Sequence, residues 1–172
     1  MSEELPTLIE PKHLALKGCH LKGKVALTKM IRLRDSLYKE GKGAYVYIDW
    51  LFVVDEQNRP MINGYMQTQL PLLCQRCLQT MLWSIDTKIA LMIITKDEKE
   101  DEIPAGYEAF TLTSTQVSLI TLIEDELILA LPIVAIHEKC PSNEYQLPNS
   151  SAPDNTFRNN PFLILAKLKN NN

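Results

Sequence analysis

The sequence predicts an α+β fold, an antiparallel sheet meander with helices packed on one face. Three successive segments, 44–54, 61–73 and 83–93, carry the β-branched, aromatic and alternating apolar residues that are typical of strands. A run of turn residues separates the first two segments, and a Cys-x-x-Cys motif separates the second from the third. Because short connections join neighbouring antiparallel strands, the three segments should form one meander with one buried face.

Helices are expected on both sides of this meander in the sequence. Thr28 is placed to cap a helix from residue 29 to about residue 39, which Gly41 would end. A further short strand is predicted over 107–112. It leads into a helix over 119–132, where apolar residues recur on one broad face and Pro132 stops the pattern.

The chain is long enough for one domain with appendages. With 172 residues, of which 45% are hydrophobic, residues 1–140 are expected to form a single globular α+β domain. Pro, Ser and Asn dominate 141–160, which is predicted to be a flexible linker. Asn160 and Pro161 would begin a short helix within 161–172. A helix of this length is unstable alone, so its Phe162 is a candidate partner contact.

Several classes of function are disfavoured by what the sequence lacks. No apolar run approaches the roughly 20 residues that span a bilayer, and the first residues do not resemble a secretory signal. Four cysteines in such a chain indicate reduced thiols, so we expect a cytoplasmic protein with no membrane partner. The six glycines form no phosphate-binding loop, and no nucleophile motif is present. We therefore predict neither an enzyme nor a small-molecule substrate.

Charge is unevenly distributed along the chain. The net charge of −3 argues against a protein that holds nucleic acid by bulk electrostatics. However, nine basic and two acidic residues lie between 12 and 42, whereas acidic residues dominate 97–108. The basic region is either a solvated face or a patch that contacts phosphates. In the second case the candidate RNA-binding residues are Lys22, Lys24, Lys29, Arg32 and Arg34.

The predicted helix over 119–132 departs from a simple amphipathic pattern. Glu126 falls within the apolar sector, and Ile128 falls within the polar wedge that contains Glu124 and Asp125. A buried carboxylate is costly unless it is paired. Glu126 therefore snorkels toward solvent, forms a structural ion pair, for instance with Arg76, or serves a binding cleft. Glu126 and Ile128 are candidate partner contacts. The three consecutive acids cannot converge on one ion without ligands from elsewhere, which disfavours a metal-dependent nuclease.

The cysteines suggest a metal site. Cys74 and Cys77 lie on a predicted hairpin turn, which is the geometry of half a zinc knuckle. His137 and Cys140 would complete a set of three cysteines and one histidine. A structural zinc ion is the only cofactor that the sequence suggests. The alternative is that two thiols are buried in a hairpin, with His137 and Cys140 as exposed loop residues. The strands on either side disfavour a thioredoxin-type redox role.

Three motifs occur in order along the chain: Leu-Cys-Gln-Arg-Cys-Leu at 73–78, Ile-Glu-Asp-Glu-Leu-Ile-Leu-Ala-Leu-Pro-Ile-Val at 123–134, and Asn-Pro-Phe-Leu-Ile-Leu-Ala-Lys-Leu-Lys at 160–169. In this order and spacing they resemble the YceD family, the large ribosomal RNA subunit accumulation proteins of bacteria and plastids. The resemblance covers almost the whole chain.

The resemblance implies a non-enzymatic role in the synthesis, processing or stability of 23S ribosomal RNA, and hence in assembly of the large ribosomal subunit. The implied partner is 23S ribosomal RNA or a pre-ribosomal particle, with a ribosomal protein as a further partner. The family supplies no catalytic residues. The alternative is a protein adaptor that binds a ribosomal protein or a processing nuclease without touching RNA.

Overall fold

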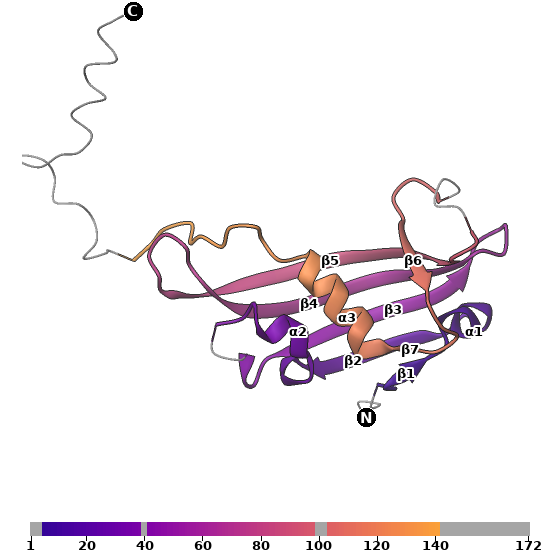
Figure 1. Ribbon diagram of the computed structural model, residues 1–172, viewed down its shortest axis with the longest axis horizontal. Coiled ribbons are helices and arrows are strands. Elements are labelled where there is room, and N and C mark those ends of the chain that lie inside the picture. The colour runs from indigo at the N-terminus through magenta and orange to yellow at the C-terminus, as the bar shows by residue number, and fades with distance from the viewer. Residues whose placement is uncertain (1–4, 39–40, 99–102, 142–172) are drawn as a thin grey trace, which may run out of the picture. The chain divides into compact units, whose positions relative to one another are not determined.

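The computed structural model describes residues 5–38, 41–98 and 103–141, and contains a five-stranded and a two-stranded sheet. The larger sheet has the order β2-β3-β4-β5-β6 (Figure 1). Its strands are β2 (His20–Ala26), β3 (Tyr45–Val54), β4 (Pro60–Leu73), β5 (Thr80–Thr95) and β6 (Glu108–Leu112). The first four pair antiparallel, and β6 pairs parallel with β5. The predicted meander is confirmed, with β2 as an additional outer strand.

Alternation along β3 and β4 decides which face of the sheet is buried. Ile48 and Phe52 on β3 lie opposite Met66 and Ile62 on β4, and all four side chains are buried. Between these pairs, Gly64 lies opposite Trp50. A Cβ atom at Gly64 would overlap the carbonyl oxygen of Asp49 and lie 2.8 Å from the Cα atom of Trp50. The close approach of the two strands therefore requires glycine at this position.

Helix α3 (Leu119–Leu129) covers the buried face of the sheet (Figure 1). It follows the two-stranded sheet of β1 (Leu8–Ile9) and β7 (Val117–Ser118). The Ser118 hydroxyl caps the helix by accepting a hydrogen bond from the Thr121 N–H at 3.2 Å. The predicted helix is confirmed, although it ends three residues before Pro132. Helix α1 (Pro11–Leu16) contacts β3 and β4.

The predicted helix over 29–39 is wrong in length. The chain forms a 3-10 turn over Leu27–Lys29 and a four-residue helix, α2 (Ile31–Arg34), which contacts α3. Beyond α2 the backbone N–H of Tyr38 donates to the carbonyl of Pro71 on β4 at 2.7 Å. This tertiary hydrogen bond replaces the one that a continuing helix would have made, so the sheet ends the helix early.

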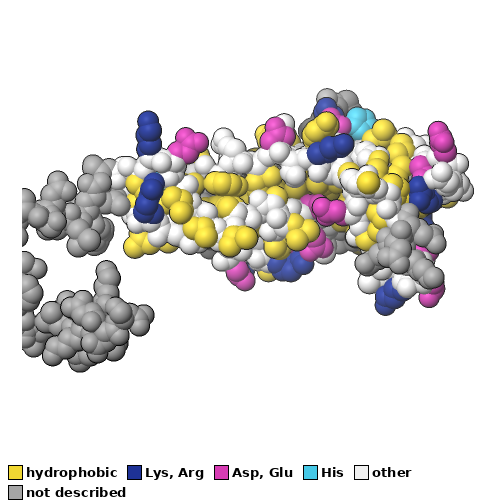
Figure 2. All heavy atoms as spheres, turned by 90° about the horizontal axis from the view of Figure 1, so that it is seen from above, with side chains coloured by type: hydrophobic (Ala, Val, Ile, Leu, Met, Phe, Trp, Pro, Cys, Tyr) yellow, Lys and Arg dark blue, Asp and Glu magenta, His cyan; other side chains and the backbone are white. Residues whose placement is uncertain are grey.

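The surface carries mixed charge. On the side shown in Figure 2, acidic and basic side chains are interspersed, with hydrophobic side chains exposed between them. No helix within residues 5–38, 41–98 and 103–141 is both long and apolar enough to cross a membrane. Apart from Pro141, the predicted linker and the predicted C-terminal helix with Phe162 lie outside the described residues.

Candidate metal centre

The structure brings together the four residues that the sequence suggests as metal ligands. Cys74 and Cys77 lie in the turn between β4 and β5, and His137 and Cys140 lie in the segment that follows α3. The Sγ atoms of Cys74 and Cys140 are 3.8 Å apart, and the Cys77 Sγ atom is 3.3 Å from His137 Nδ1. All four ligand atoms lie within 4.8 Å of one another. The three cysteines are free thiols, so this group can hold a metal ion.

Backbone hydrogen bonds hold the cysteine turn in shape. The N–H of Cys74 donates to Gln79 at 2.9 Å, and the N–H of Leu78 donates back to the Cys74 carbonyl at 2.8 Å. The turn closes through Leu78, whose φ of 57° is in the left-handed region. A non-glycine residue there costs on the order of 1 kcal/mol. The Gln75 N–H also donates to the Ala135 carbonyl at 2.8 Å, which brings the segment after α3 to the turn.

The local electrostatics favour a thiolate at Cys74. Burial by itself would raise the pKa of the Cys74 thiol, but hydrogen bonds from the backbone N–H groups of His137, Cys77 and Arg76 lower it to about 5. The His137 N–H lies 3.4 Å from the Cys74 Sγ atom. Burial raises the pKa of Cys77. Backbone donors therefore favour the thiolate form of Cys74, which is the form that binds metal ions.

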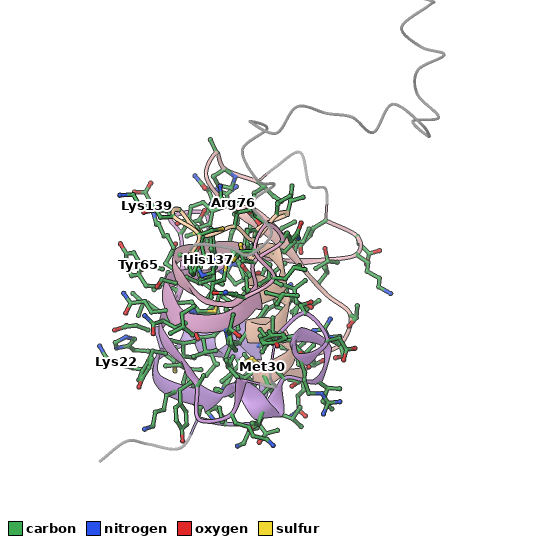
Figure 3. All side chains as sticks on the ribbon, turned by 90° about the vertical axis from the view of Figure 1, so that its left-hand side faces the viewer. Lys22, Met30, Tyr65, Arg76, His137 and Lys139 are labelled. Atoms are coloured by element: carbon green, nitrogen blue, oxygen red, sulfur yellow. The ribbon has the colours of Figure 1, made fainter. Side chains whose placement is uncertain are left out.

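Arg76 lies between the two cysteines in sequence and closes the cluster from outside. Its Nε atom donates to the Cys140 Sγ atom at 2.9 Å, and its Nη2 atom donates to the His137 carbonyl at 2.8 Å (Figure 3). The bond to Cys140 raises the pKa of Arg76. The expected pair of Arg76 with Glu126 is therefore not formed, because the guanidinium donates to Cys140 and His137 instead. The sequence analysis missed this contact with the cluster, although the position of Arg76 inside the Cys-x-x-Cys motif could have indicated it.

The donor set and its spacing fit a tetrahedral ion. Zinc–sulfur bonds of about 2.3 Å and zinc–nitrogen bonds of about 2.0–2.1 Å place ligand atoms roughly 3.5–3.8 Å apart. The separations of 3.8 and 3.3 Å are close to this range. Four protein ligands are the pattern of structural zinc sites, whereas catalytic sites keep one position open. An ion bound by these four residues would cross-link the hairpin between β4 and β5 to the segment that follows α3.

The five candidate RNA-binding residues do not form one patch. Lys22 and Lys24 project from β2, where Lys22 contacts Asp49 and Lys24 lies 4.7 Å from the centre of the Tyr45 ring. Lys29 ends the 3-10 turn before α2, Arg34 is the last residue of α2, and both are exposed. Arg32 is committed to α3, where its guanidinium reaches Glu124 at 3.2 Å and Asp125 at 2.7 Å. Arg32 therefore holds α2 to α3, whatever else it contacts.

The buried carboxylate on α3 is Glu124 and not Glu126. Glu124 is 5% exposed and accepts hydrogen bonds from the Leu33 N–H at 2.9 Å and the Arg32 Nε atom at 3.2 Å. The helical pattern placed Glu124 in the polar wedge, but α2 packs over that wedge and supplies the donors. Both carboxylate oxygens of Glu124 are therefore engaged in hydrogen bonds, which disfavours its use as a metal ligand.

Glu126 and Ile128 are both partly buried. Burial, followed by the nearby charges of Glu108 and Asp125, raises the pKa of Glu126 to about 7. The helical pattern placed Ile128 in the polar wedge, but its side chain packs against the core, and the neighbouring Leu129 is 72% exposed.

Comparison with known proteins identifies relatives for most of the chain. A protein-family model described as "Large ribosomal RNA subunit accumulation protein YceD" matches residues 62–169, which include all four residues of the cluster. A protein of Haemophilus influenzae named "Large ribosomal RNA subunit accumulation protein YceD" is 29% identical over 170 residues. The alignment covers 96% of this chain and 97% of that protein. No solved structure matches the chain significantly.

Proposed function

Because this chain belongs to the YceD family, we propose that it is a non-enzymatic factor for the accumulation of 23S ribosomal RNA. It would act during synthesis, processing or stabilisation of that RNA as the large subunit is assembled in the cytoplasm. The observation that carries this proposal is the alignment over nearly the full length of both chains with a protein of that name. Its partner is 23S ribosomal RNA or a pre-ribosomal particle.

We further propose that Cys74, Cys77, His137 and Cys140 hold a structural zinc ion. The support is the closed set of four protein ligands and the donors that lower the pKa of Cys74. An ion in such a site supplies cross-linking and no reaction chemistry, which agrees with a factor that works by binding. Arg76 would offset the negative charge that three thiolates leave around one divalent ion.

The rRNA role is tested by deleting the gene in its own host. The ratio of 23S to 16S ribosomal RNA and the large-subunit peak in a sucrose gradient should both fall, and a plasmid copy should restore them. Unchanged RNA ratios and gradients in the deletion strain would refute the proposed function.

The zinc proposal is tested on the purified chain. Metal analysis by mass spectrometry should find one zinc per chain, and Cys77→Ser should lose it, whereas Cys19→Ser should keep it. Cys19 is the matched control because it is the cysteine outside the cluster. A wild-type chain that binds no zinc under reducing conditions would contradict the assignment.

A further inference from the structure

The face of the five-stranded sheet opposite α2 and α3 exposes aromatic rings. Along β3 and β4, residues that alternate with the buried ones point outward, and Tyr47 and Tyr65 are 54% and 57% exposed. Figure 3 shows Lys22 and Tyr65 pointing away from the sheet, on the side opposite Met30. Tyrosine is common in strands, but two such rings exposed on neighbouring strands also give this face flat apolar surfaces that a ligand can contact.

The strand register arranges this outer face in two rows. In one row Lys24, Tyr47, Gln67 and Asp86 follow one another across β2 to β5. In the next row the order is Lys22, Asp49, Tyr65 and Lys88. Tyr47 and Tyr65 are therefore diagonal neighbours on adjacent strands, a relation that places their Cα atoms about 7–8 Å apart. Two consecutive bases of an extended nucleic acid strand can stack on two rings at this spacing.

Three hollows follow one another across this face, and the two tyrosines form the walls between them. The central hollow, of about 600 Å³, is lined by residues that include Lys24, Tyr47 and Tyr65. A second hollow of about 810 Å³ shares Tyr47 and Gln67 with it. A third, of about 520 Å³, shares Asp49 and Tyr65 and reaches Lys88. Together they form a shallow trough in which rings alternate with open space.

The charge on this face suits a nucleic acid strand, which carries phosphates as well as flat bases. The exposed lysines at the two ends of the rows, Lys22, Lys24 and Lys88, outnumber the carboxylates of Asp49 and Asp86. Asp49 is paired with Lys22, which leaves Lys24 and Lys88 against the single carboxylate of Asp86. The chain as a whole carries a net charge of −3, so bulk electrostatics cannot hold RNA. Stacking must then supply much of the affinity, and two exposed tyrosines provide it.

We propose that this outer sheet face binds single-stranded RNA, with Tyr47 and Tyr65 stacking two bases and Lys24 and Lys88 contacting the flanking phosphates. The identity of that RNA as ribosomal rests on the proposed function, whereas the binding chemistry does not. A duplex would not serve, because its bases are stacked on each other and cannot reach the tyrosine rings.

The test measures fluorescence anisotropy of labelled ten-nucleotide RNAs, single-stranded and duplex, with the full-length zinc-loaded chain. Tyr47→Ala and Tyr65→Ala should each weaken single-strand binding about 5- to 150-fold, which corresponds to ~1–3 kcal/mol per stacked base. Tyr47→Phe keeps the ring and should bind like wild type. Lys24→Ala should also weaken binding, whereas Lys17→Ala, at an exposed lysine that follows α1 and lies outside the five-stranded sheet, is the matched control. The slope of log affinity against log salt should be only about −1.4 to −2 for two to three phosphate contacts.

The outcomes separate this inference from the proposed function. Equal binding by the alanine variants, stronger binding of duplex, or no RNA binding at all would overturn the sheet-face site. If the gene deletion still lowered 23S ribosomal RNA in those cases, the protein would act as an adaptor through a protein partner. Tyrosine-dependent binding without any change in ribosomal RNA would support this site and refute the proposed function.

Discussion

Replacing Glu124 by alanine should lower the free energy of unfolding by about 1–4 kcal/mol. The Glu124 side chain is 6% exposed, and it accepts the Leu33 N–H at 2.9 Å. Alanine would leave that buried N–H without an acceptor, which costs about 1–3 kcal/mol. The ion pair with Arg32 adds at most about 1 kcal/mol, because the Arg32 side chain is 51% exposed and keeps Asp125 at 2.7 Å.

Two matched variants separate the hydrogen bond from the charge. Glu124→Gln keeps an oxygen that can accept the Leu33 N–H and loses only the ion pair, so its cost should be about 1 kcal/mol or less. Asp125→Ala removes a carboxylate whose side chain is 45% exposed, and it should cost less than about 1 kcal/mol. The expected order of destabilisation is therefore Glu124→Ala first, with the other two variants close together.

The assay is equilibrium unfolding in urea, in which a shifted midpoint at constant slope reports a change in stability. Calorimetry gives a second measurement, since about 2–4 °C of melting temperature corresponds to 1 kcal/mol in a chain of this size. A loss under about 0.5 kcal/mol for Glu124→Ala would refute the reasoning. So would a glutamine variant as unstable as the alanine variant, because the acceptor for Leu33 would then not be what joins α2 to α3.

Three further predictions concern other parts of the molecule. Gly64→Ala should lower the free energy of unfolding by at least about 2 kcal/mol, because its Cβ atom would overlap the backbone of β3. A decrease of less than about 0.5 kcal/mol in urea unfolding would contradict this. The pKa of Glu126 is raised to about 7, so the folded protein binds this proton more tightly than the unfolded chain, and its stability should fall as pH rises from 4.5 toward 7. Glu126→Gln should flatten that part of the stability–pH curve, and an identical curve would refute the assignment. Arg76→Leu should weaken zinc affinity about 10- to 100-fold in competition with a chromophoric chelator, with Arg76→Lys in between; unchanged affinity would show that the contact with Cys140 does not act on the metal.

The sequence predicted those parts of the fold whose signals are local. Alternation in β3, β4 and β5, together with the turn at Cys74 and Cys77, was enough for the meander. Thiol chemistry was enough to select His137 and Cys140, because a half site requires two more ligands. Strand β2 escaped detection because its outward residues are charged and its inward positions include Gly23, so it shows little apolar alternation.

The errors arose where a second element decides the outcome. A helical pattern shows which residues share a face, but it does not show what packs there. Glu124 became buried because α2 covers it and offers the Leu33 N–H. The helix expected over 29–39 stopped early because Tyr38 bonds to β4. The sequence did not show that Tyr47 and Tyr65 lie on the exposed face, because both faces of β3 are rich in large side chains and the buried face was not known.

An ion held by the four-residue cluster would also close a long loop of the chain. Cys77 and His137 are 60 residues apart, and the chain between them contains β5, β6, β7 and α3. In the chain-entropy treatment of cross-links, closing a loop of this length lowers the entropy of the unfolded ensemble by the equivalent of about 4 kcal/mol. The cysteine pair is synthesised before His137 and Cys140, so the proposed site would be complete only after the segment that follows α3 had been made. The supply of zinc in the cell would thereby control how firmly the second half of this chain is held to the first.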